Sequence, residues 1–212
     1  MQHDLTTARF YGILDAGYVS PDKWVSKAKD LITGGAGIVQ IRAKGHSRAE
    51  IRVLTKEVWH LFKDGPIPLI INDDLELALE FEGAGLHVGQ DDMDAREARK
   101  ALGPDRVLGL STHSIEQARG AIELADILTY FAVGPVFPTQ TKPTYTPVGL
   151  NLVQQVANEA NNPLPWFCIG GINRQNAHQV KEAGGQRLVA VSDVLCDEDT
   201  PAAVQEYLEL YK

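Results

Sequence analysis

Three side chains that suit an anion lie together in one stretch rich in glycine and proline, residues 134–142. Thr139 and Thr141 each offer a hydroxyl donor, and Lys142 offers a compact ammonium group. Such a set suits phosphate or diphosphate oxygens better than a neutral ligand. An apolar run leads into the stretch, which indicates a strand that opens into a loop. Taken alone, a loop of this kind is as often an exposed turn with an incidental lysine, so the other parts of the chain must decide.

Other polar side chains stand at or just after the ends of further short apolar runs. They are Gln40, Arg42, Lys44, Asn72, Asp73, Asp92 and Ser111. Asp73 and Asp92 can supply oxygen ligands to Mg2+, which typically takes one or two carboxylates together with substrate phosphate oxygens. Arg42, Lys44 and Lys142 can then neutralise a diphosphate in a chain that is acidic overall. The combination favours a site for a metal and a departing pyrophosphate.

Each of these groups also has a purely structural interpretation. The alternating polar residues at 40–44 could form the solvated face of an edge strand. In the acidic runs 72–74 and 91–94, at least one carboxylate should cap the helix that follows. His87 ends an apolar run, and we expect a hydrogen-bonded residue at the rim rather than a metal ligand, because the six histidines lack zinc-ligand spacing.

Short apolar runs alternate with amphipathic stretches along the whole chain. Eight runs are predicted strands: 10–14, 38–42, 69–72, 85–88, 106–111, 130–133, 166–169 and 188–191. Predicted helices follow them, with caps or first residues at 20, 47, 74, 94, 114, 148, 173 and 200. Eight such units predict an α/β fold, a (β/α)8 TIM barrel that forms a single domain over residues 1–212, whereas a doubly wound sheet usually stops at about five to seven strands. In a barrel, the polar residues at the strand ends would meet at one rim.

The barrel also predicts a second anion site, after the seventh and eighth strands. Loops at these places commonly bind a phosphate group through backbone N–H groups and a helix N-terminus. Gly170 and Gly171 follow the seventh strand, and glycine lets the backbone approach a ligand closely. Ser192 follows the eighth.

The composition argues against several other classes of protein. The chain has 212 residues, 44% of them hydrophobic, and a formal net charge of −8 without a basic cluster, which disfavours nucleic acid and anionic membrane as partners. No apolar run reaches the roughly 18 residues of a membrane span, and the N-terminus does not resemble a signal peptide. Two cysteines, Cys168 in an apolar run and Cys196, have no metal-site spacing. We therefore expect a cytoplasmic protein with reduced thiols.

Seven motifs in this order resemble the thiamine-phosphate synthase family. They are QIRAK (40–44), IND (71–73), LHVGQDD (86–92), GLS (109–111), GPVFPTQTK (134–142), IGGI (169–172) and VAVS (189–192). The resemblance extends from about Phe10 to Leu195. Each motif alone is a weak signal, whereas seven in one order are highly specific.

The resemblance implies an enzyme that joins hydroxymethylpyrimidine diphosphate to a thiazole phosphate with the help of Mg2+. Pyrophosphate would leave first, and the thiazole nitrogen would trap the pyrimidine cation to give thiamine phosphate. Carried over by motif, the substrate-binding residues are Gln40 for the pyrimidine, Arg42, Lys44, Asn72 and Lys142 for the pyrophosphate, Ser111, Thr139 and Thr141 between the substrates, and Gly171, Val191 and Ser192 for the thiazole phosphate. The implied metal ligands are Asp73 and Asp92. The residues expected to be catalytic are Arg42, Lys44, Ser111 and Lys142.

Three segments depart from the family pattern, around Thr129, Pro143 and Gln186. They bear on strand packing and loops more than on chemistry. Two alternatives remain beside the synthase: a thiazole tautomerase of the same superfamily, and a barrel that binds a phosphorylated ligand without catalysis. Neither should need the full set of pyrophosphate and metal residues. The sequence leaves open the oligomeric state and whether the thiazole substrate carries a carboxylate.

Overall fold

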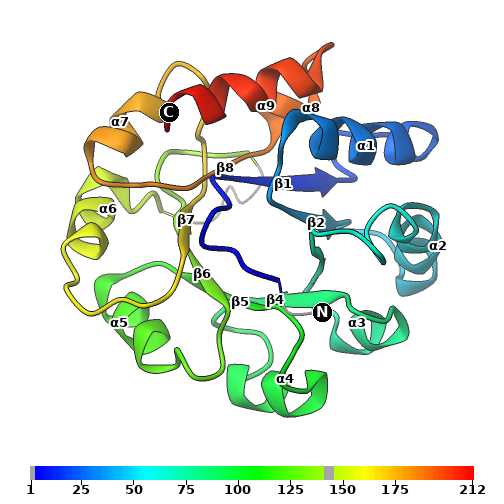
Figure 1. Ribbon diagram of the computed structural model, residues 1–212, viewed down its shortest axis with the longest axis horizontal. Coiled ribbons are helices and arrows are strands. Elements are labelled where there is room, and N and C mark those ends of the chain that lie inside the picture. The colour runs from blue at the N-terminus through cyan, green and yellow to red at the C-terminus, as the bar shows by residue number, and fades with distance from the viewer. Residues whose placement is uncertain (1–2, 141–145) are drawn as a thin grey trace.

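Eight parallel strands close into a barrel in the computed structural model, which describes residues 3–140 and 146–212. The strands pair in sequence order, and β1 pairs with β8 to close the ring (Figure 1). Their bounds are β1 Phe10–Asp15, β2 Ile38–Arg42, β3 Leu69–Asn72, β4 Gly85–Val88, β5 Leu108–Thr112, β6 Tyr130–Val133, β7 Trp166–Cys168 and β8 Leu188–Ala190. The predicted TIM barrel is confirmed.

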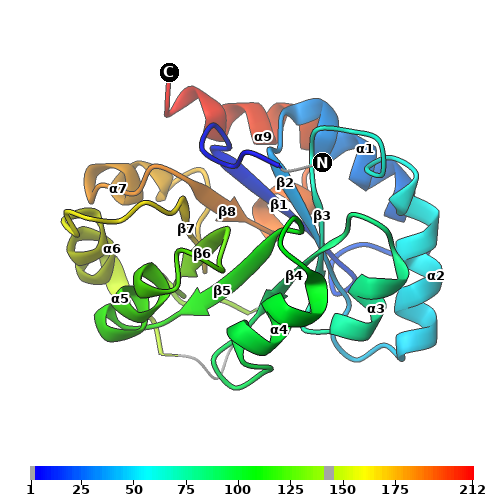
Figure 2. The same cartoon turned by 60° about the horizontal axis from the view of Figure 1, so that its bottom comes forward.

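Helices surround the barrel on the outside, as the tilted view in Figure 2 shows. A 3-10 turn, Pro21–Lys23, precedes the first of them. The helices are α1 Trp24–Gly34, α2 Arg48–Trp59, α3 Leu75–Glu80, α4 Ala95–Leu102, α5 Ile115–Glu123, α6 Gly149–Ala157, α7 Ala177–Glu182, α8 Ser192–Leu195 and α9 Thr200–Glu209. The last helix, α9, lies beside α1, so the two ends of the helical ring meet. Among the described residues, no helix is long and apolar enough to cross a membrane.

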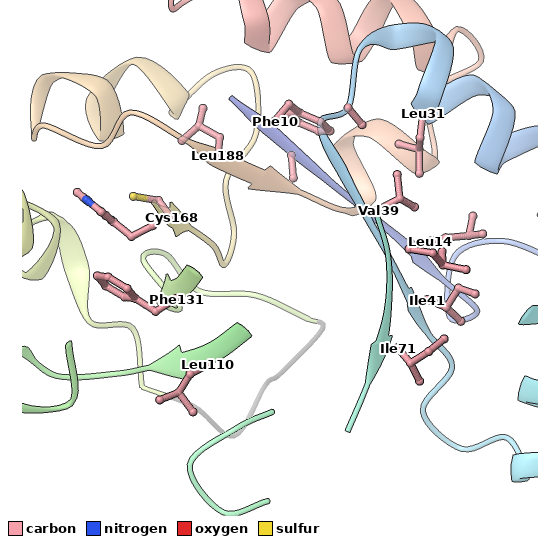
Figure 3. Packing of buried hydrophobic residues seen from close by; sticks show 14 of the residues in the cluster. Phe10, Leu14, Leu31, Val39, Ile41, Ile71, Leu110, Phe131, Cys168 and Leu188 are labelled. Carbon is pink, nitrogen blue, oxygen red and sulfur yellow. The ribbon is translucent and has the colours of Figure 1, made fainter. Parts of the chain in front are cut away.

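The strands are buried on both faces, which explains why they appear in the sequence as continuous apolar runs. In β1, Phe10 and Leu14 point outward into the layer between strands and helices (Figure 3), whereas Tyr11 and Ile13 point into the barrel. The inward layer also includes Phe167 of β7, which is separated from β1 by β8. Two separate apolar layers therefore hold each strand in place and fix where its polar end residue emerges.

Several predicted helix ends are confirmed by their hydrogen bonds. Ser47 is the predicted cap of α2, and it forms a capping box with Glu50 in which both reciprocal bonds are present. Asp74 and Asp94 cap α3 and α4. Gly35 ends α1 with φ +98°, a left-handed conformation that glycine adopts without a steric penalty.

Other predicted boundaries are wrong by a few residues. Ser20 makes no side-chain cap bond. Asn173 caps the turn before α7 rather than the helix, because its Oδ1 accepts from the backbone N–H groups of residues 175 and 176. By contrast, α9 begins at Thr200 as predicted, with Asp199 as its cap. Ser114 caps α5 as predicted, and Gln117 accepts from the N–H of His113. The short helix α8 was not predicted, since four residues carry no periodic signal.

Candidate active site

A cavity of about 700 Å3 opens at the carboxyl ends of the strands. We call it the rim cavity. It is lined by every predicted site residue within the described part of the chain: Gln40, Arg42, Lys44, Asn72, Asp73, Asp92, Ser111, Thr139, Gly171, Val191 and Ser192. Thr141 and Lys142 lie outside the described residues. Other lining residues that the sequence did not single out include Tyr18 and His113.

Arg42 is held by a buried partner at the end of the first strand. Its Nη1 lies 2.6 Å from Oδ2 of Asp15, and the two side chains are 12% and 3% exposed. The other carboxylate oxygen of Asp15 accepts a hydrogen bond from the backbone N–H of Gly17 at 2.8 Å. Burial makes this pair a fixed support for the guanidinium group, unlike an exposed ion pair. Asp15 was not predicted as a site residue, although a carboxylate that ends an otherwise apolar strand is a usable signal.

Asp73 adopts a backbone conformation that is unusual for a residue with a side chain. Its φ is +61°, and among the described residues it alone combines a side chain with positive φ. Its Oδ2 accepts from Lys44 Nζ at 2.8 Å and from Asn72 Nδ2 at 2.6 Å. The Lys44 side chain is 58% exposed, so this ion pair contributes little stability. An unfavourable conformation at the mouth of a cavity is typical of a residue positioned for function.

Asp92 is positioned by the loop that follows β4. Its Oδ2 accepts from the backbone N–H of Gly89 at 2.8 Å, and its neighbour Asp91 also lines the rim cavity. The described residues contain no group of three or more His, Cys, Asp or Glu side chains placed to hold a metal. Two carboxylates from adjacent strand ends fit Mg2+, which completes its coordination with water and substrate oxygens, better than Zn2+, which prefers a full set of protein ligands.

A chain of buried polar side chains lies beneath the cavity. Gln40 Nε2 donates to Tyr11 Oη at 2.9 Å, and Tyr11 Oη lies 2.8 Å from Tyr130 Oη. His87 connects the other end, with Nδ1 3.0 Å from Tyr130 Oη and Nε2 2.8 Å from Ser111 Oγ. The predicted hydrogen-bonded role of His87 is thereby confirmed. The two tyrosines were missed because, in sequence, each is one aromatic residue in an apolar strand.

The loops after β7 and β8 form a second part of the rim cavity. Gly170 and Gly171 have φ of +101° and +63°. A Cβ at Gly171 would lie 2.4 Å from the carbonyl oxygen of Pro138, so a side chain there would displace the loop after β6. Val191 and Ser192 meet this loop at the start of α8. Gly170 and Gly171 thus pack closely against the loop after β6 and also line the rim cavity, which charged side chains line elsewhere.

The sequence and the fold of this chain are both similar to those of known proteins. Residues 10–194 match the family model described as thiamine monophosphate synthase. Thiamine-phosphate synthase of Halalkalibacterium halodurans is 36% identical over 201 residues, with 94% of this chain and 93% of the relative covered. That of Bacillus velezensis is 39% identical over 203 residues, with coverage of 94% and 88%. Among solved structures, thiamine phosphate pyrophosphorylase from Pyrococcus furiosus superposes with a TM-score of 0.81 at 25% identity, covering 96% of this chain and 95% of that one.

Proposed function

Because this chain belongs to the thiamine monophosphate synthase family, we propose that its rim cavity joins a pyrimidine diphosphate to a thiazole phosphate, releasing pyrophosphate and giving thiamine phosphate. The chain is a transferase of thiamine biosynthesis. The observation that carries the proposal is that one cavity is lined both by charged side chains from the ends of β2 to β4 and by the residues that follow β7 and β8. Such a cavity offers two different anion sites to two substrates.

The charged side of the cavity is assigned to the pyrimidine diphosphate. Gln40 would contact the ring. The groups assigned to the pyrophosphate are Arg42, Lys44, Asn72 and Lys142, of which Lys142 lies outside the described residues. Ser111, Thr139 and Thr141 would lie between the substrates, Thr141 again outside the described residues. Arg42 suits this role because Asp15 already fixes its position, so that little side-chain entropy is lost when it meets an anion.

Asp73 and Asp92 are the residues that would hold Mg2+. When bound, the ion supplies positive charge to the oxygens of the departing pyrophosphate. Lys44 Nζ lies 2.8 Å from Oδ2 of Asp73, so the ammonium group stands beside the carboxylate that would hold the ion. From this position its exposed side chain would add a second positive charge for the pyrophosphate oxygens.

The chemistry asks for charge stabilisation and positioning more than for proton transfer. As pyrophosphate leaves, negative charge grows on its oxygens, and fixed cations around them stabilise the transition state more than the ground state. The thiazole nitrogen is itself the nucleophile, so no general base is required. Gly171, Val191 and Ser192 would hold the thiazole phosphate at the distance needed for attack. Arg42, Lys44, Ser111 and Lys142 remain the proposed catalytic residues.

The second anion site is tested by Ser192→Arg. The larger side chain would crowd the start of α8, so we expect the KM for the thiazole phosphate to rise about tenfold or more, a loss of roughly 1.4 kcal/mol of binding. The KM for the pyrimidine diphosphate should stay near the wild-type value. Steady-state kinetics with each substrate varied in turn checks this. A rise for the pyrimidine substrate instead would mean that the two anion sites are assigned the wrong way round.

The proposed function also implies the ligands and the cellular compartment of the protein. The partners would be the two small-molecule substrates, with the 212 residues acting as one catalytic domain. We infer a cytoplasmic enzyme, because the described chain carries its two cysteines as free thiols, Cys168 buried and Cys196 exposed. Burial raises the pKa of the Cys168 thiol, which keeps that group protonated and unreactive.

A further inference from the structure

We propose that the buried polar chain beneath the rim cavity fixes the orientation of the Gln40 amide and thereby selects a 4-aminopyrimidine over a 4-oxopyrimidine. The inference rests on the proposed function, because it takes Gln40 as the residue that contacts the pyrimidine. The buried chain consists, in order, of Gln40, Tyr11, Tyr130, His87 and Ser111. Its three middle members are positioning residues, since they act on the substrate through the residues at the two ends.

Each member of the buried chain comes from a different strand of the barrel. The order is β2, β1, β6, β4 and β5, so the chain crosses the interior rather than following one edge. Its four contacts measure 2.9, 2.8, 3.0 and 2.8 Å from Gln40 to Ser111. The five side chains belong to residues that are at most 8% exposed. Apolar neighbours such as Ile70 and Phe167 surround them, so the hydrogen bonds are made in a low-dielectric setting, where they are strong and costly to break.

The proton of each group determines the direction of the next bond. Tyr11 Oη accepts from Gln40, and in the proposed direction its own hydroxyl donates to Tyr130 Oη. The Tyr130 hydroxyl then donates to Nδ1 of His87. A neutral imidazole has one donor and one acceptor, so His87 carries its proton on Nε2 and donates it to Ser111 Oγ. The hydroxyl proton of Ser111 is therefore left for the cavity.

The two phenols keep their hydroxyl protons. Burial raises the pKa of both Tyr11 and Tyr130 above the usual value, so neither ionises at the pH of a cell. The barrel also leaves space for the Tyr130 ring that joins Tyr11 to His87. A Cβ at Gly109 would lie 2.1 Å from Cζ of Tyr130 and 2.5 Å from its Oη. Gly109 pairs in register with both Tyr130 and His87, so the ring reaches across β5 only because that strand lacks a side chain there.

The direction of these hydrogen bonds determines which polar groups of the Gln40 amide face the ligand. With Nε2 turned to Tyr11, the Oε1 acceptor and the second N–H of Nε2 remain for the cavity that Gln40 lines. An acceptor beside a donor matches an exocyclic amine beside a ring nitrogen, the same pairing by which glutamine recognises adenine. A 4-oxopyrimidine presents the opposite pair, a carbonyl oxygen beside a ring N–H.

The other end of the buried chain favours the same direction. Reversing every bond would turn the Gln40 amide over and would leave Ser111 donating to His87, with only lone pairs toward the cavity. Ser111 is assigned to the space between the substrates, and a diphosphate oxygen that reaches this space can only accept a hydrogen bond, so it would need the Ser111 hydroxyl as a donor. A substrate that carries both an aminopyrimidine and a diphosphate thus fits one direction at both ends. The 4-oxo analogue would match the Gln40 amide only in the reversed direction, in which the Ser111 hydroxyl no longer donates to the diphosphate.

Tyr130→Phe tests the inference, because it leaves Gln40 and Tyr11 in contact but removes the group that fixes their direction. The readout is the ratio of kcat/KM for the 4-amino and the 4-oxo pyrimidine diphosphates. We expect the ratio to fall by about 10- to 100-fold, the range for one hydrogen-bond mismatch at a buried amide. The KM for thiazole phosphate should not move. Tyr211→Phe is the matched control, since it loses a hydroxyl bond to the carbonyl of Gly185 and touches neither the buried chain nor the rim cavity.

An unchanged ratio in Tyr130→Phe, with both substrates slowed alike, would overturn the inference and leave the buried chain a packing element. A second measurement does not depend on turnover. Nitrogen-15 NMR of the wild-type protein at about pH 8, above the ordinary pKa of imidazole, should show His87 as the Nε2–H tautomer, with the signal assigned by its loss in His87→Asn. The Nδ1–H tautomer would contradict the proposed direction. If the wild type coupled neither pyrimidine, the proposed function would fail, and the tautomer would still decide the direction of the bonds.

Discussion

Asp92→Asn should lose at least about 100-fold in kcat/KM for coupling, the equivalent of roughly 3 kcal/mol of transition-state stabilisation. The substitution removes a negative charge where Mg2+ is proposed to bind and keeps the shape of the side chain. The amide oxygen can still accept from the N–H of Gly89, so the loop after β4 should keep its conformation. We therefore expect the midpoint of thermal unfolding to stay within about 2 °C of wild type. Activity should be partly regained only at raised Mg2+ concentration.

Asp94→Asn provides the matched control for this loss. It removes the same charge two residues away, from a side chain that caps α4 and does not line the rim cavity. Asparagine is as good a cap as aspartate, so both stability and rate should be close to wild type. Near-normal turnover of Asp92→Asn, with an unchanged Mg2+ requirement, would remove Asp92 from the metal site.

Arg42→Gln is expected to lose both activity and stability, for two separate reasons. Loss of a fixed guanidinium group from the pyrophosphate side should lower kcat/KM by about 100- to 1000-fold. Asp15, at 3% side-chain exposure, would keep a buried charge without its partner. That costs about 3 to 5 kcal/mol, enough to lower the midpoint of thermal unfolding by roughly 10 °C. Thermal unfolding and steady-state kinetics on the same preparation separate the two effects.

Adding Asp15→Asn to Arg42→Gln tests this separation. The double variant no longer buries an unpaired carboxylate at position 15, and asparagine can still accept from the N–H of Gly17, so most of the lost stability should return. Activity should stay low, because the guanidinium group is still absent. A double-mutant cycle gives the coupling between the two residues. Recovery of activity together with stability would show that Arg42 supports the fold and does not act on the substrate.

The fold could be predicted because its signals are repeated and local. Eight apolar runs and the caps between them specify strand-helix units, and a parallel sheet buried on both faces produces those runs directly. The described site residues could be located because a barrel gathers all strand ends at one rim. Because eight strand-helix units specify a closed barrel, Asp73 and Asp92, which follow neighbouring strands, were expected to line the same cavity.

The sequence could not show contacts that cross the barrel. Tyr11 and Tyr130 stand 119 positions apart, and nothing local says that their hydroxyls meet. In the sequence Asp15 is only the last residue of a strand, and its ion pair with Arg42 becomes apparent only in the structure. Helix α8 is too short for a periodic pattern, although it begins at Ser192, which the resemblance had already marked. The missed contacts of Tyr11 and Asp15 share one cause, since each depends on how separate strands are placed and not on residue spacing along the chain.

The most direct test is the coupling reaction itself. Purified protein would be incubated with hydroxymethylpyrimidine diphosphate and thiazole phosphate, with Mg2+ or with a chelator, and thiamine phosphate and pyrophosphate would be measured. We predict equal amounts of both products with Mg2+ and almost none with the chelator. Absence of product with Mg2+, in a protein that still binds thiazole phosphate by calorimetry, would contradict the account and leave Arg42, Asp73 and Asp92 without a role.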